Sequence, residues 1–130
     1  MGYSKKNRVD ADAIATLAKE MKNKLIQMNS GIDDVKDKLD EFGRGDGDIA
    51  YWSGEQAQDW FGKAYKNLAN SYLRVAKTCD AMRVTLKYAY DSYTKDKNTS
   101  TKKATLSNLK GQYDSLYSQA MSAAKKIEGK

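Results

Sequence analysis

Apolar residues recur at alternating spacings of three and four along the first part of the chain. The members of this row are Ala11, Ile14, Ala18, Met21, Leu25, Met28, Ile32, Val35, Leu39 and Phe42. Such spacing keeps one stripe of side chains on one face of an α-helix, where it can pack against a partner helix. Asp10 is an expected N-cap and Gly43 an expected C′ residue. The pattern therefore predicts a helix between these two residues, with its stripe buried.

A second stretch repeats the spacing. Its row consists of Phe61, Tyr65, Leu68, Tyr72, Val75, Cys79, Met82, Leu86, Ala89 and Tyr93. Ser53, followed three residues later by Gln56, predicts a capping box at the start of this helix. The second helix is expected over about 54–95, a length of roughly 60 Å at 1.5 Å per residue.

A third, shorter row predicts an amphipathic helix over about 101–128. It consists of Leu106, Leu109, Tyr113, Leu116, Ala120, Ala123 and Ile127. These side chains are smaller and lie among more hydroxyl groups than those of the other rows. We therefore expect the third helix to pack less strongly than the first two.

Two polar segments separate the three rows. The first is the glycine-rich stretch 43–48 and the second is the stretch 95–101; both are typical of loops. The expected organisation is a flexible N-terminus over 1–9, a helical hairpin over 10–95, and a linker with a C-terminal helix over 96–130. The fold class is all-α, an antiparallel hairpin with coiled-coil-like packing. A two-helix core is thin, so either the third helix covers it or a second chain completes a four-helix bundle on dimerisation.

The composition argues against an enzyme. The 130 residues include no histidine and no proline, and Cys79 is the only cysteine. Without histidine the chain lacks the commonest general base and a favoured metal ligand. The acids near the glycine-rich loop lack the spacing of an EF-hand. We expect no catalytic, cofactor-binding or metal-binding residues, and we expect Cys79 to be a small buried group.

The net charge of +6 is spread over mixed signs rather than gathered in one basic patch. Nucleic-acid binding is therefore a weak third hypothesis. No segment has the apolar length of a membrane span, and the N-terminus lacks the apolar core of a cleaved signal peptide. The tyrosines at 65, 72 and 93 share the apolar stripe, which favours a protein partner. Arg44-Gly45-Asp46 is best interpreted as a polar turn.

Trp52 and Gly54 stand in the first loop, directly before the second helix. The indole of Trp52 is large enough to cover the open end of a hairpin core, while Gly54 allows the backbone to turn sharply beside it. A helix, a short loop with Trp-x-Gly and a second long helix resemble the WXG-motif family of early-secreted-antigen-like proteins. The resemblance covers roughly residues 10–95.

The resemblance implies a dimeric four-helix bundle, formed with itself or a related small helical protein, and secretion by a type VII system without a cleaved signal peptide. The third helix is a departure from the family. A second departure is that no aromatic residue after residue 86 is followed four positions later by an acid, a pair that many members carry as an export signal. The alternative is a cytoplasmic targeting adaptor or chaperone that pairs with the helical domain of a larger exported toxin.

Overall fold

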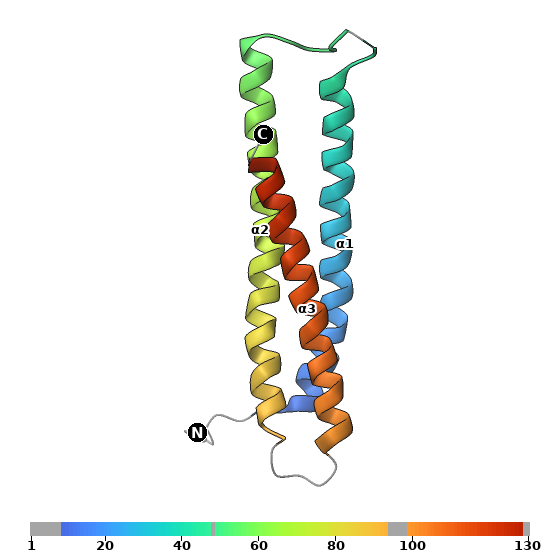
Figure 1. Ribbon diagram of the computed structural model, residues 1–130, viewed down its shortest axis with the longest axis vertical. Coiled ribbons are helices and arrows are strands. Elements are labelled where there is room, and N and C mark those ends of the chain that lie inside the picture. Colours follow the sequence, from blue (N-terminus) through green and yellow to red (C-terminus); the bar gives the residue numbers. More distant parts are fainter. Residues whose placement is uncertain (1–8, 48, 94–98, 129–130) are drawn as a thin grey trace, which may run out of the picture.

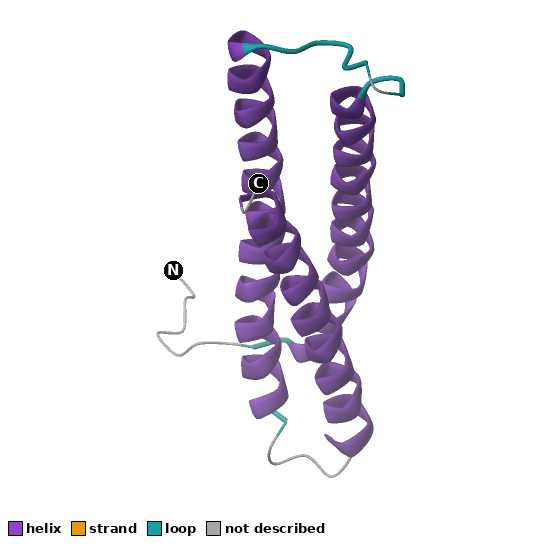
Figure 2. Ribbon diagram, turned by 45° about the horizontal axis from the view of Figure 1, so that its top comes forward, coloured by secondary structure: helices purple, strands orange, loops and turns teal. Residues whose placement is uncertain are grey.

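The computed structural model describes residues 9–47, 49–93 and 99–128 and is all-helical. Its elements are α1 (Ala11–Arg44), α2 (Glu55–Asp91) and α3 (Thr99–Glu128). The three helices run alternately up and down, and α3 crosses one face of the long α1–α2 hairpin (Figures 1 and 2). Within the described residues, no helix is long and apolar enough to cross a membrane.

The start of α1 agrees with the sequence, whereas two other expected caps are wrong. Asp10 accepts a hydrogen bond from the backbone N–H of Ala13 at 3.0 Å, so it is the N-cap. Gly43 remains helical, and α1 ends at Gly45 with a φ of 74°. No side chain caps α2, whose N-cap is Gly54. The chain turns through Gly54, and its carbonyl accepts the first helical bond, so the expected capping box does not form.

The outer boundaries differ by a few residues from those expected. The last helical residue of α2 is Asp91, and α3 starts at Thr99 inside the expected polar loop. The rest of that loop, residues 94–98, lies outside the described residues, as does the expected flexible N-terminus apart from Val9.

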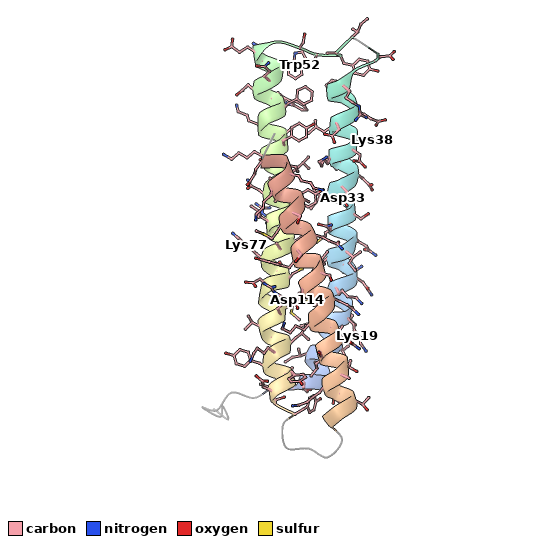
Figure 3. The ribbon with its side chains drawn as sticks, in the orientation of Figure 1. Lys19, Asp33, Lys38, Trp52, Lys77 and Asp114 are labelled. Carbon is pink, nitrogen blue, oxygen red and sulfur yellow. The ribbon has the colours of Figure 1, made fainter. Side chains whose placement is uncertain are left out.

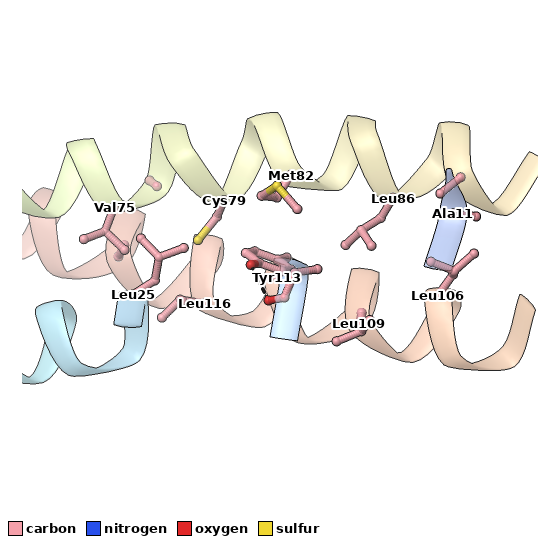
Figure 4. Packing of buried hydrophobic residues seen from close by; sticks show 14 residues of the cluster. Ala11, Leu25, Val75, Cys79, Met82, Leu86, Leu106, Leu109, Tyr113 and Leu116 are labelled. Carbon is pink, nitrogen blue, oxygen red and sulfur yellow. Dashed lines mark hydrogen bonds between the residues drawn. The ribbon is translucent and has the colours of Figure 1, made fainter. Parts of the chain in front are cut away.

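The most extensive packing joins α2 and α3, which corrects the expectation that the third helix would pack weakly. The reason is the small side chains Ala120 and Ala124, both fully buried, which let the two backbones approach closely. Tyr113 fills the space between them and donates a hydrogen bond to the carbonyl of Ala18 at 2.7 Å (Figure 4). The small size of the two alanines therefore strengthens the packing between α2 and α3. The buried residue is Ala124 rather than the expected Ala123, which is half-buried.

Eight hydrophobic residues were expected to form the interface or core, and they fall into two groups. Four are buried, namely Leu25, Tyr72, Val75 and Leu86. The other four are half-buried, namely Ile32, Leu39, Phe61 and Leu68. Ile32 and Leu68 pack against the end of α3, around Ala124 and Ile127, whereas Leu39 and Phe61 lie nearer to the loop along the chain. The core is therefore thickest where three helices meet.

The apolar stripe of α1 is only partly buried, contrary to expectation. Ala11, Ala18 and Leu25 face the other helices, but Met28 is 54% exposed and Val35 56% exposed. The inner face of α1 also includes polar Asn29, whose buried Oδ1 has no hydrogen-bond partner. Because α3 lies on one side of the hairpin, the outer row of α1 has no helix to cover it among the described residues.

Three tyrosines, two on α2 and one directly after its end, fix the antiparallel register of the hairpin. Each hydroxyl donates a hydrogen bond to an aspartate of α1, and the pairs are Tyr65 with Asp40, Tyr72 with Asp33, and Tyr93 with Asp12. The two residue numbers add to the same total in every pair, so a single register satisfies all three. A shift by one helical turn would break them together.

These hydrogen bonds predict that the hairpin loses stability in alkali. Burial and the bond to Asp40 raise the pKa of Tyr65 to about 12, and burial and Asp33 raise the pKa of Tyr72 further. A raised folded pKa gives stability that is complete below the unfolded pKa of about 10 and is lost as pH rises through the folded value. At neutral pH, Tyr72→Phe should cost about 1 kcal/mol.

The measurement is chemical denaturation of both proteins between pH 8 and pH 12. We expect the difference between the wild type and Tyr72→Phe to shrink above pH of about 10. A difference that stays constant across this range would show that the hydroxyl does not contribute through its protonated form.

Candidate protein-interaction surface

The loop between α1 and α2 is built by glycines in positive-φ conformations. Gly45 has a φ of 74°, and a Cβ there would lie 2.1 Å from the carbonyl oxygen of Ile49. The backbones of Asp46 and Ile49 exchange two hydrogen bonds, of 2.9 and 3.2 Å, which close the turn. Gly54 has a φ of 105° with open space around it, so it is needed for its backbone angle rather than for its size.

Five aromatic rings gather at this end of the hairpin. They are Phe42, Tyr51, Trp52, Trp60 and Phe61, from the end of α1, the loop and the start of α2. We call them the aromatic tip. The ring of Trp52 lies 5.7 Å from that of Trp60 and 6.2 Å from that of Phe61, measured between centroids. Figure 3 shows Trp52 at the far end of the hairpin, beyond the end of α3.

The aromatic tip is packed within itself yet open to solvent. Trp52 is 39% exposed and Trp60 46% exposed, while Tyr51 stacks on Phe42 and is 61% exposed. Phe61 reaches inward, where its ring lies 3.6 Å from the position of a Cβ on Gly43. Large aromatic rings with preset positions are typical of binding hot spots, because little side-chain freedom is lost on docking.

An open groove of about 520 Å³ runs beside the aromatic tip, between the end of α1 and the start of α2. Trp52, Ala57 and Phe61 form apolar walls, and Arg44 and Asp40 add charge. Asp40 is already bonded to Lys36 and Tyr65. A second groove of about 620 Å³ continues from Phe61 to the end of α3 at Ile127. The two grooves suit an apolar segment of a protein more than a small polar substrate.

Cys79 and the acidic side chains are the remaining candidates for chemistry among the described residues. Cys79 is fully buried, as expected, and burial raises the pKa of its thiol to about 11, so it stays protonated at neutral pH. In the part of the chain that the structure describes, no cluster of three or more His, Cys, Asp or Glu side chains is placed to hold a metal ion.

The sequence predicts that Trp52 and Gly54 stand in the loop before the second helix, and the structure places both between α1 and α2. It did not single out Trp60, nor the role of Phe42 and Tyr51 as parts of one cluster. The available signal was the high density of aromatic residues, since four of the five lie within the short stretch 51–61.

Comparison with known proteins gave no family-model match and no significant match to a curated protein or a solved structure.

Proposed function

We propose that this chain is a substrate or co-exported helical partner of a type VII secretion system and acts through protein–protein contacts. The observation that carries the proposal is the position of Trp52 and Gly54. They lie at the hinge of a long helical hairpin, and Trp52 belongs to an exposed aromatic tip. A hairpin with Trp-x-Gly at its hinge resembles the WXG-motif family.

The aromatic tip is the surface through which the chain engages the secretion machinery. The charges beside it are mixed, since Glu41 pairs with Lys38 and Asp59 with Lys63. A partner segment with apolar anchors would suit this surface, because the aromatic contacts would hold it.

The alternative is a cytoplasmic adaptor that pairs with the helical domain of a toxin and remains in the cell. One observation favours it: the chain has no aromatic residue after residue 86 that is followed four positions later by an acid. The adaptor would use the same exposed apolar surfaces, so the two functions differ in location rather than in binding chemistry.

Fractionation of a culture of the native host separates the two functions. The proposal predicts the intact chain in the medium while a cytoplasmic marker protein stays in the cells. Complete retention with the marker would favour the adaptor. Nucleic-acid binding would need a separate result, DNA affinity that falls steeply with added salt.

A further inference from the structure

The three helices are held unequally, because α1 contributes little to the shared core. Four of its 34 residues are buried, against nine in α2, and the four are Ala11, Ala18, Leu25 and Asn29. Only Leu25 among them is a large apolar side chain. Burial of apolar surface is the main favourable term in folding, so α1 gains less from docking than α2 does.

Asn29 weakens the docking of α1 further. The residue is 8% exposed, and its side-chain oxygen Oδ1 has no hydrogen-bond partner among the described residues. A buried amide oxygen gives up its hydrogen bond to water when the helix docks and regains it when the helix moves away. The side chain therefore favours the separated state of α1 over the docked state.

Solvent also reaches α1 from two sides. Toward α3, two open grooves of about 490 and 310 Å³ border the seam between the helices, with Asp33 in the wall of the first and Ile26 in the wall of the second. On another side, Met28 and Val35 are more than half exposed. Few buried contacts and wide access to solvent are the features of an element that opens locally, without global unfolding.

Many of the bonds between α1 and its neighbours are polar. Its aspartates accept hydrogen bonds from three tyrosine hydroxyls, and Lys22 donates one to Gln112 at 2.7 Å. The hydroxyl of Tyr113 donates another to the carbonyl of Ala18. Each such bond adds little net stability, because water takes the place of the lost partner when the helices separate.

The pairing of α2 with α3 is built differently. Buried apolar side chains of both helices meet in one cluster along the seam between them (Figure 4). At the edge of that seam, Arg83 pairs with Asp114 at 3.4 Å, and its guanidinium lies 4.0 Å from the centroid of the Tyr117 ring. None of these three edge residues belongs to α1, so the contacts between α2 and α3 survive when α1 moves away.

We propose that α1 is a detachable helix, which separates from the α2–α3 pair as one unit while that pair stays folded. Its departure uncovers a buried apolar seam, since Leu25 of α1 belongs to the same cluster as Cys79 of α2 and Tyr113 of α3. The docked form is the closed state that hides this seam, and the open form is a minor state of the same chain. The inference concerns the isolated chain and holds whether the chain is exported or retained.

Native-state hydrogen exchange of the full chain, read by mass spectrometry of its peptides, compares the three helices. We expect amides in the middle of α1 to exchange about a hundredfold faster than those around Val75 in α2 and Tyr113 in α3. Equal protection of all three helices would overturn the proposal, because α1 would then open only with global unfolding. Fastest exchange in α3 would overturn it as well.

Cys79 reports the same event independently. It is the only cysteine and is 0% exposed, so a thiol reagent reaches its sulfur only through an opening of the bundle. The labelling rate of Cys79 should give the same opening equilibrium as the α1 amides. Labelling as slow as the exchange of the most protected α2 amides would contradict the proposal.

Asn29→Leu tests the cause. Leucine keeps the branched shape and replaces the amide by two methyl groups, so α1 should open about tenfold less often. Asn23→Leu is the matched control, since Asn23 is an exposed asparagine of the same helix and the change in helix propensity is the same. Amide exchange in α1 and labelling of Cys79 should both slow markedly more in Asn29→Leu. An effect no larger than that of Asn23→Leu would overturn the proposal.

Discussion

Val75→Asp is expected to unfold the bundle. Val75 is fully buried on α2, within the cluster that α1, α2 and α3 build together. An aspartate there loses apolar packing and places a carboxylate away from water, so we expect a cost of about 4 kcal/mol or more. Domains of this size are stable by only about 5–15 kcal/mol, so this substitution removes much of the folding free energy.

Val84→Asp on the same helix is the matched control. Its side chain is 53% exposed, so the same chemical change should alter the unfolding free energy by no more than about 0.5 kcal/mol. Circular dichroism melts of the two variants make the comparison. Equal melting temperatures would show that the seam of α2 is not buried as described.

Trp52→Ala is expected to abolish most export while leaving the fold nearly intact. The side chain is 39% exposed and its ring lies against Trp60 and Phe61 of the aromatic tip, so we expect little of the core to depend on it. Its loss removes the largest side chain of the loop from the proposed docking surface. We expect at least a tenfold fall in secreted protein, since removal of a hot-spot residue costs about 2 kcal/mol or more.

Tyr88→Ala is the control, because Tyr88 is an aromatic residue that is 65% exposed on α2 and lies outside the aromatic tip. Gly54→Ala should also impair export, since its φ of 105° is strained for any residue with a Cβ. Secretion and melting are measured for each variant. If Trp52→Ala loses stability and export in proportion, the residue only caps the hairpin. If Trp52→Ala is exported normally, the resemblance to the WXG-motif family loses its main support.

The three helices could be predicted because each apolar row keeps one heptad phase over its whole length. The helix ends were harder, since they depend on which glycine takes a positive φ. Gly43 and Gly45 are equally permissive in sequence, and only the tight approach of Ile49 to Gly45 selects the second. Ser53 has a capping side chain, but the turn at Gly54 starts α2 one residue later.

The register of the hairpin was present in the sequence but was not used. Tyr65, Tyr72 and Tyr93 are separated by one heptad and then three, and their aspartate partners on α1 follow the same spacings in reverse order. Equal spacings in reverse order allow one antiparallel register to satisfy all three hydrogen bonds. Their place on the apolar stripe pointed instead to a protein partner, although the acceptors of their hydroxyls lie within the same chain.

The partial exposure of α1 could not be predicted from its own pattern. A heptad stripe shows that a face is apolar but not which neighbour covers it. The choice depends on α3, whose alanines and Tyr113 pack against α2 and leave the other side of the hairpin open. The aromatic tip was found only in part for a similar reason, because Phe42 joins it through space from the end of α1.

The central claim is that this chain leaves the cell through a type VII system. The most direct measurement is an immunoblot of culture medium from the native host with and without its type VII secretion ATPase. We predict the intact chain in the medium of the parent strain, its loss on deletion of the ATPase gene, and its return on complementation. Equal amounts in the medium of all three strains, or none in any, would contradict the claim.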